Sequence, residues 1–191
     1  MFLKSSKTHW VCSRMCKYMI IKINPLFGIQ LNDTTLTFGM TKEDVITSLG
    51  EPFGVNGTEQ LYYFENELRF DFNTDDKIEY IEFLGGIDGK LKPEIYGVSA
   101  FDIHADELIR ILTRENNGNI IDNENGYSYA FPNIGIGIYR ESIPKDIEEM
   151  VQEAKDEGEP MNDEDYKYEL SKAIHWATIG LGEKSYYNSG E

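Results

Sequence analysis

The segment from Phe38 to Pro52 has the pattern of a short helix whose start and end are both specified. Thr41 and Asp44 have the spacing of a capping box, in which each side chain bonds the other residue's backbone amide. Gly50 allows the chain to leave the helix, and Pro52 prevents its continuation. Between these signals the apolar residues fall on one helical face: Val45, Ile46 and Leu49. The sequence therefore predicts a helix that stops at Gly50.

Three segments with the composition of β-strands follow this helix, at 61–64, 68–72 and 78–83. Polar residues at 65–67 and 73–76 separate them and predict turns. In the middle segment apolar and charged residues alternate, which predicts one buried and one solvated face. The alternating residues are Leu68, Arg69, Phe70, Asp71 and Phe72. We expect a helix followed by an antiparallel meander.

A degenerate second copy of this unit begins 63 residues later. The apolar positions of the first helix recur as Leu108, Ile109 and Leu112. A hairpin follows, from 127–131 into 134–138, although its alternation is displaced by one residue. His104 occupies the position of Thr41, so Asp102 is the alternative helix cap.

The motif from Gly39 to Pro52 resembles the helix-opening motif of SmpA/OmlA and beta-lactamase-inhibitor-protein-like domains. That motif is a Gly, a helix that begins with Thr, and then Leu-Gly-x-Pro before a meander with an aromatic pair such as Tyr62 and Tyr63. The resemblance covers the first unit well and the second in outline. It implies a tandem helix-plus-sheet binder. Members of the SmpA/OmlA branch are envelope lipoproteins, and this chain differs from them in showing no signal peptide or lipobox.

Two further helices are predicted after the second unit. The first has Pro144 in its first turn and ends before Gly158. Its apolar face consists of Ile147, Met150, Val151 and Ala154. The second begins at Asn162, has acids in the favoured first-turn positions, and runs to about Lys172.

The interval from Glu141 to Glu169 contains twelve acids and three lysines, a net charge of −9. A solvated helical face is the usual meaning of such a run. The alternative is a docking surface for a basic protein, because complementary charges steer encounter. The acids that we assign to this surface are Glu148, Glu149, Glu153, Asp156, Glu157, Asp163, Glu164 and Asp165.

The segment 174–182 is predicted as a final strand with glycines at alternate positions, a pattern shared by 134–139. One face of the sheet there lacks side chains, and such a face usually accepts an aromatic ring or another backbone. The residues that could fill it are Trp176, Tyr186 and Tyr187, which we prefer to a ligand groove. If a cleft forms instead, its candidate residues are Tyr139, His175, Trp176 and Tyr186.

The residue patterns that catalysis or cofactor binding requires are missing from this sequence. His104 and His175 accompany no Gly-x-Ser-x-Gly elbow that would supply a nucleophile. His9, Cys12 and Cys16 offer three ligands, whereas structural zinc needs four. We therefore expect no catalytic residue, no metal site and no cofactor.

The formal net charge of −16 and the sequence pI of about 4.5 disfavour phosphate backbones and anionic lipid headgroups as partners. We expect binding to neither nucleic acid nor membrane, a cytoplasmic location, and a monomer when unbound. Residues 1–18 carry four cations and no acid. They are expected to be a disordered or non-native tail, with Met19 as the functional start.

These patterns predict an α+β fold in which two helix-then-meander repeats form a sheet with helices packed on one side. The expected divisions are a tail at 1–18, a first unit at 19–92, a second unit at 93–141, and acidic helices with the final strand at 142–191, packed on the second unit. The expected function is a non-enzymatic protein-binding inhibitor, of the immunity or antitoxin kind, that neutralises a basic toxin such as a nuclease. The alternatives are a structural or assembly adaptor, and a small-ligand binder or enzyme that uses the sheet cleft.

Overall fold

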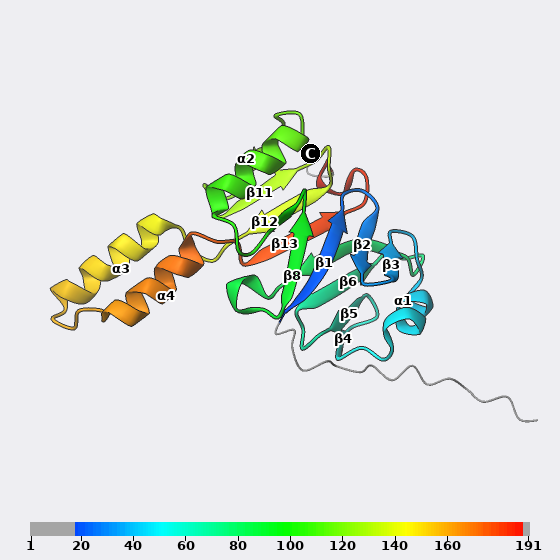
Figure 1. The fold of residues 1–191 in the computed structure, drawn as a ribbon, viewed down its shortest axis with the longest axis horizontal. Helices are drawn as coiled ribbons and strands as arrows, with labels where there is room; N and C mark the ends of the chain where they lie inside the picture. Colours follow the sequence, from blue (N-terminus) through cyan, green and yellow to red (C-terminus); the bar gives the residue numbers. More distant parts are fainter. Residues whose placement is uncertain (1–17, 189–191) are drawn as a thin grey trace, which may run out of the picture.

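A computed structural model describes residues 18–188 and shows an α+β fold (Figure 1). The expected tail, with its three candidate zinc ligands, lies outside the described residues except for Tyr18. Within the described part, four α-helices accompany two β-sheets. The helices are α1 (Lys42–Leu49), α2 (Ala105–Glu115), α3 (Pro144–Asp156) and α4 (Asp163–Ala173).

The strands form two sheets instead of the single sheet expected. The five-stranded sheet has the order β3 (Thr34–Thr37), β2 (Gly28–Leu31), β1 (Met19–Asn24), β8 (Leu91–Ile95) and β9 (Val98–Ser99). The eight-stranded sheet has the order β10 (Ile121–Asp122), β11 (Ser128–Phe131), β12 (Ile136–Tyr139), β13 (Thr178–Gly182), β7 (Ile78–Phe83), β6 (Leu68–Phe72), β5 (Gln60–Tyr63) and β4 (Gly54–Asn56). The smaller sheet is built around the parallel pair of β1 and β8, which lies outside both meanders.

Helix α1 has the predicted capping box. The Thr41 side chain accepts a hydrogen bond from the Asp44 amide at 3.2 Å, and the Asp44 carboxylate accepts one from the Thr41 amide at 2.8 Å. Gly50 ends the helix with a φ of 86°, a left-handed value that favours glycine. The expected helix boundaries and cap are confirmed.

The cap of helix α2 differs from the alternative that the sequence suggested. The His104 ring accepts a hydrogen bond from the Asp106 amide at 3.3 Å. Asp102 does not cap the helix, because its carboxylate is already engaged by Lys92 at 2.9 Å and by the Ser99 hydroxyl at 2.7 Å.

Two runs of four antiparallel strands meet in the eight-stranded sheet. Strands β4 to β7 follow α1 and pair in sequence order, and strands β10 to β13 follow α2 in the same way. The two runs join where β13 pairs with β7, with Leu181 opposite Ile81. Strand β13 therefore links both halves of the sheet and does not pack on the second unit alone.

The final strand is shorter than predicted, since it begins at Thr178 and not at Ile174. The Ile174 amide still bonds the Leu170 carbonyl as the cap of α4. Trp176 is then fixed in a buried position, where its indole nitrogen donates to the Ala105 carbonyl at 3.2 Å. These contacts hold the chain in a turn before the strand can start.

One hydrophobic cluster joins the two sheets with helices α1 and α2. Its fully buried members include Ile21, Leu36, Val45, Phe70, Phe83, Leu108, Leu112, Ile136 and Leu181. The predicted alternation holds in β6, where Leu68, Phe70 and Phe72 are buried and Arg69 and Asp71 are half-buried. The apolar face of the eight-stranded sheet therefore belongs to the core, and its polar face points away from it.

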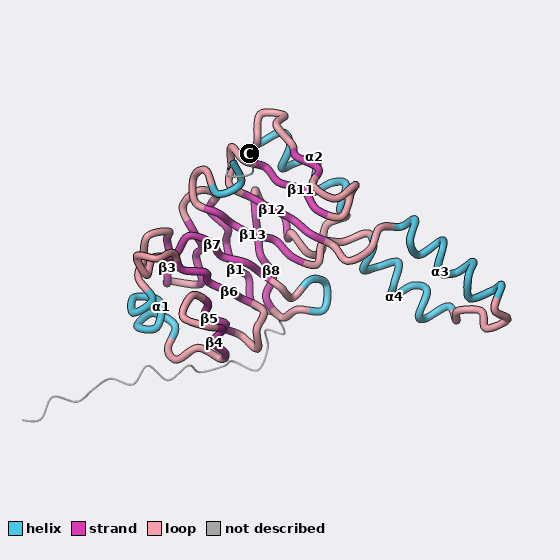
Figure 2. The backbone as a smooth tube through the Cα atoms, turned by 180° about the vertical axis from the view of Figure 1, so that it is seen from behind, coloured by secondary structure: helices cyan, strands magenta, loops and turns pink. Residues whose placement is uncertain are grey.

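Helices α3 and α4 form a two-helix arm, residues 144–173, that projects from the body of the molecule (Figures 1 and 2). Of its helical residues, Ile147 and Ala173 are the two that are buried. Instead of packing along the second unit, the arm meets the body at its root. Most of its surface is consequently open to solvent.

Candidate functional site

Helix α3 is fixed to the body at its first turn. Pro144 occupies a first-turn position, where its missing N–H costs no helical hydrogen bond. The Asp146 carboxylate accepts from the Ile143 amide at 2.8 Å and from the Tyr127 hydroxyl at 2.7 Å. The hydrogen bond to Asp146 raises the pKa of Tyr127 above its ordinary value, because the carboxylate holds the phenolic proton. Asp146 therefore attaches the start of α3 to the body, and its carboxylate is already hydrogen-bonded.

Helix α4 begins at Asn162, as the sequence predicts. The Asn162 side chain accepts hydrogen bonds from the Glu164 and Asp165 amides, each at 2.9 Å. Asp163, Glu164 and Asp165 lie in the first turn, where the positive end of the helix dipole favours negative charge. The local sequence thus stabilises a helix whose start carries three exposed carboxylates.

Arg140 joins the root of the arm to the sheet and was not recognised in the sequence. The Arg140 side chain is buried and donates to the Ala173 carbonyl at 2.8 Å and to the Gly126 carbonyl at 3.0 Å. Its guanidinium lies 4.9 Å from the centroid of a Trp176 ring. Burial lowers the pKa of Arg140 below its ordinary value. A single Arg at the end of a strand gives no sequence signal of these distant partners.

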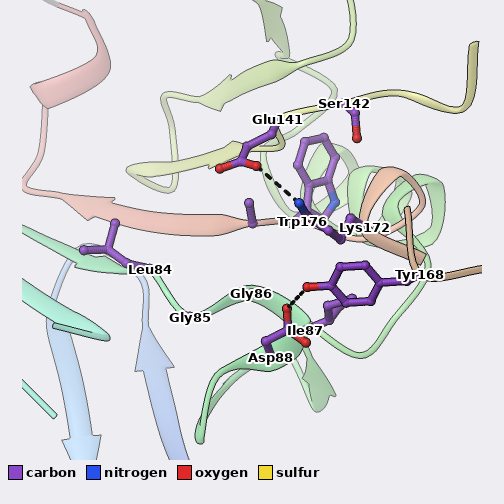
Figure 3. Close-up of a pocket in the computed structure, with 11 residues that line it drawn as sticks. Leu84, Gly85, Gly86, Ile87, Asp88, Glu141, Ser142, Tyr168, Lys172 and Trp176 are labelled. Atoms are coloured by element: carbon purple, nitrogen blue, oxygen red, sulfur yellow. Dashed lines mark hydrogen bonds and ion pairs between the residues drawn. The ribbon is translucent and has the colours of Figure 1, made fainter. Parts of the chain in front are cut away.

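A small pocket opens between the root of the arm and the loop after β7 (Figure 3). On one side the Tyr168 hydroxyl donates to Asp88 at 2.8 Å, and on the other Lys172 pairs with Glu141 at 3.6 Å. The bond to Asp88 raises the pKa of Tyr168. The cavity volume is about 210 Å³. Pockets for drug-sized ligands usually measure ~300 to 1,000 Å³, so this pocket is small for such a ligand.

The eight acids assigned to a docking surface are all exposed in the arm or in its connecting turn. Among the described residues, Glu149 is the one member of this set with an ion pair, to Lys145 at 3.4 Å. Asp156 accepts a hydrogen bond from Gln152 at 2.8 Å. The arm therefore presents a negative surface that its own cations neutralise only in part.

The glycines of the eight-stranded sheet make room for tyrosine rings, as the sequence predicts. A Cβ atom added to Gly137 would lie 2.3 Å from the Tyr187 hydroxyl, and one added to Gly182 would lie 2.4 Å from Tyr186 Cβ. Gly180 faces Tyr80, a ring that the prediction did not include. Trp176, which the prediction did include, lies elsewhere. The tyrosines occupy the space that would otherwise form a groove.

The four candidate cleft residues lie in different surroundings. Tyr139 ends β12 with 39% of its surface exposed, and Trp176 is buried at the root of the arm. The His175 ring bonds the Ser171 carbonyl within its own turn at 2.7 Å. Tyr186 stacks on Tyr80, with ring centroids 4.6 Å apart. Neither of the two described pockets is lined by more than one of these four side chains.

A charged network crosses the polar face of the same sheet. Arg69 pairs with Asp71 at 2.9 Å and with Glu82 on the neighbouring strand at 3.0 Å, and its guanidinium lies 5.6 Å from the Tyr80 ring centroid. Burial raises the pKa values of Asp71 and Glu82, and the attraction of Arg69 only partly opposes this. Burial and nearby carboxylates also raise the pKa of Glu79.

No group of three or more His, Cys, Asp or Glu residues in the described part of the chain is placed to hold a metal ion. Among residues 18–188, each helix is too short or too polar to cross a bilayer. Comparison with known proteins found no matching family model, no matching curated protein and no matching solved structure.

Proposed function

We propose that this protein is a non-enzymatic, protein-binding inhibitor whose acidic arm docks onto a basic partner. The observation that carries the proposal is the arm itself, which projects from the body and exposes the eight carboxylates assigned to the docking surface. A helix pair that buried these faces in the body could not present them to a partner. The arm's position leaves them accessible from several directions.

The charge of the arm supports a basic partner. The interval from Glu141 to Glu169 carries −9 of the formal charge of −16. Concentrated charge of one sign accelerates encounter with an oppositely charged protein and rejects like-charged competitors. At physiological ionic strength the Debye length is ~8 Å, so charges at an interface still act while distant ones are screened. Binding through the arm is therefore expected to weaken as salt rises.

The form of this function that we favour is an inhibitor of the immunity or antitoxin kind. It would act as a cytoplasmic monomer on a toxin such as a nuclease. The resemblance of residues 39–52 to inhibitor-like domains supports it, together with the proposal that the two helix-and-meander runs are repeats of one unit. An adaptor is the alternative that would use the same arm. A small-ligand binder or an enzyme that uses a cleft in the sheet is less well supported, because tyrosines fill the glycine-lined face where that cleft would lie.

Capture followed by an activity measurement tests this proposal. The tagged protein is used to isolate partners from a lysate of its source organism, and each captured protein is assayed with and without an excess of this chain. An inhibitor abolishes an activity of its partner in a one-to-one titration. A captured partner whose activities are all unaffected would favour the adaptor.

A further inference from the structure

We propose that a groove at the outer end of the arm takes the apolar face of a basic amphipathic helix supplied by the partner. This inference rests on the proposed function, since it names the element that the acidic arm binds. It adds a specific place, a groove next to the turn between α3 and α4, and a specific chemistry, apolar side chains flanked by Lys or Arg.

The arm lacks the apolar packing that short helices normally require. Helices α3 and α4 have 13 and 11 residues, and isolated helices shorter than ~12 to 15 residues are marginal in water. Helices in proteins gain most of their stability from packing an apolar face, yet only Ile147 and Ala173 are buried among the residues of these two helices. Met150 remains 40% exposed on α3. The two helices therefore leave apolar surface that a third element could cover.

The uncovered surface includes a groove between the two helices. Its apolar lining comes from Val151 on α3, from Pro160 and Met161 in the connecting turn, and from Tyr166 on α4. The groove volume is about 430 Å³. That is large enough for several buried aliphatic side chains, whose burial supplies most of the favourable free energy of such contacts. Acidic residues stand beside the apolar lining, Glu148 on α3 and Asp163 on α4.

A helix is the element that fits this surface best. A third helix laid against a helical hairpin completes a bundle, with interaxial distances of ~8 to 10 Å. An added strand would need an open sheet edge, and residues 144–173 contain no strand. Apolar anchors at helical spacing can enter the groove while the intervening side chains reach its acidic rim.

The charge of the arm decides between the candidate helices. A second copy of this chain would bring two intervals of −9 within a Debye length of each other, so like-charge repulsion opposes that pairing. An apolar helix without cations would desolvate the rim carboxylates and give them no partner. A helix with Lys or Arg beside its apolar face satisfies both requirements. Lys155 is the one cation in the groove lining, and it should oppose such a helix locally.

The test uses a synthetic 18-residue peptide as the probe, with Leu at helical i, i+3, i+4 spacing and Lys at most other positions. A second peptide has the same composition but a scrambled order that gives no apolar face. Binding of each labelled peptide to the full chain is measured by fluorescence anisotropy at low and physiological salt. We expect the helical peptide to bind at least about tenfold more tightly than the scrambled one, a difference of ~1.4 kcal/mol.

Matched variants locate the binding. Val151→Thr with Met161→Gln changes the groove and leaves the net charge as it is, and it should weaken the helical peptide about tenfold. Val55→Thr with Ile20→Gln likewise replaces two apolar side chains by polar ones, at exposed positions of the body that do not line the groove, and it should change affinity less than twofold. Lys155→Gln should strengthen binding. Circular dichroism checks helix content, and Met161→Gln alone, in the turn outside both helices, repeats the test if the double variant loses helix.

The outcomes separate this inference from the proposed function. Equal binding of the two peptides, or equal effects of the groove and control variants, overturns the groove. Glu148→Gln, Glu149→Gln, Asp156→Asn and Glu157→Gln together test the charge. If these four changes weaken binding while the groove variant does not, the proposed function of the acidic arm is retained. The inference about the groove is then overturned. A concentration-dependent dimer that Met161→Gln abolishes would assign the groove to a second copy and also overturn the inference.

Discussion

Gly180 lies where a side chain and a buried tyrosine would compete for the same space. A Cβ atom at this position would lie 1.9 Å from the Tyr80 hydroxyl oxygen and 2.5 Å from Tyr80 Cζ. Tyr80 cannot easily move away, because Tyr186 stacks on its ring and Arg69 lies beside it. The glycine is therefore required by its neighbours and not by its backbone conformation.

The Gly180→Ala change should destabilise the protein by ~1 to 3 kcal/mol, the usual range for an overpacked interior. Gly54→Ala is the matched control in the same sheet, since a Cβ atom there meets its nearest neighbour, Asn66 Oδ1, at 3.3 Å. Denaturant titration of both variants gives the comparison. Equal stability of the two variants would show that the Tyr80 ring is loosely held.

Glu79 should make the stability of the protein depend on pH. Burial, Glu183 and Asp71 raise its pKa in the folded state. A raised pKa means that the folded state favours the protonated form, so the associated stability is present in acid and is lost as pH rises through the folded pKa. Glu79→Gln should therefore leave the melting temperature unchanged near pH 4 and raise it at pH 8. A melting temperature below wild type at pH 8 would show that the ionised carboxylate is stabilising.

At the level of the element, α1 and α2 each precede a run of antiparallel strands but are packed to different depths. The sequence pairs Leu49 with Leu112. In the structure Leu112 is fully buried, whereas Leu49 is only half-buried at the edge of the core. Equivalent positions in a sequence pattern do not fix how much structure covers each helix.

Leu112→Ala should cost ~2 to 5 kcal/mol of unfolding free energy, because it opens a cavity in the core. Leu49→Ala should cost clearly less, since part of that side chain already contacts water. The measurement is chemical denaturation of both variants monitored at one wavelength. Equal losses of unfolding free energy would indicate that Leu49 and Leu112 contribute equally to the core, as the repeat pattern suggests.

The caps of α1 and α4 should respond differently to the same kind of change. Asn162→Ala and Thr41→Ala each remove a helix cap worth about 1 kcal/mol. The arm contributes few buried residues, so Asn162→Ala should speed amide exchange in α4 and leave global unfolding nearly unchanged. Thr41→Ala should lower global stability, because Val45 of α1 belongs to the core. A global loss from Asn162→Ala equal to that from Thr41→Ala would mean that the arm folds as part of the core.

Local signals explain which elements the sequence could predict. The capping box at Thr41 and the alternation around Phe70 depend on residues close in the chain, and both are present in the structure. The burial of Arg140 depends instead on partners far along the chain, because its side chain donates to the Ala173 carbonyl and its guanidinium lies against Trp176. That arrangement arises when β13 pairs with β12, after the chain has passed through the whole arm.

At the scale of the whole molecule, a compact two-sheet body carries a projecting acidic arm (Figure 2). The body contains the shared hydrophobic cluster, so its fold does not require the arm's outer surface. The acids from Glu148 to Asp165 are consequently free to vary without loss of the core. Their concentration on one projecting element is the feature that the proposed binding function explains.

A pull-down with three baits tests whether these arm carboxylates bind the partner. The baits are the wild-type chain, the arm variant with Glu148, Glu149, Asp156 and Glu157 changed to their amides, and a control with Glu43, Glu51, Asp75 and Glu124 changed likewise. Both variants lose four exposed acids, so their net charge is the same. We expect the wild type and the control to capture a basic protein at physiological salt. The arm variant, with its fold intact by circular dichroism, should not capture it. Equal capture by all three baits would contradict this expectation.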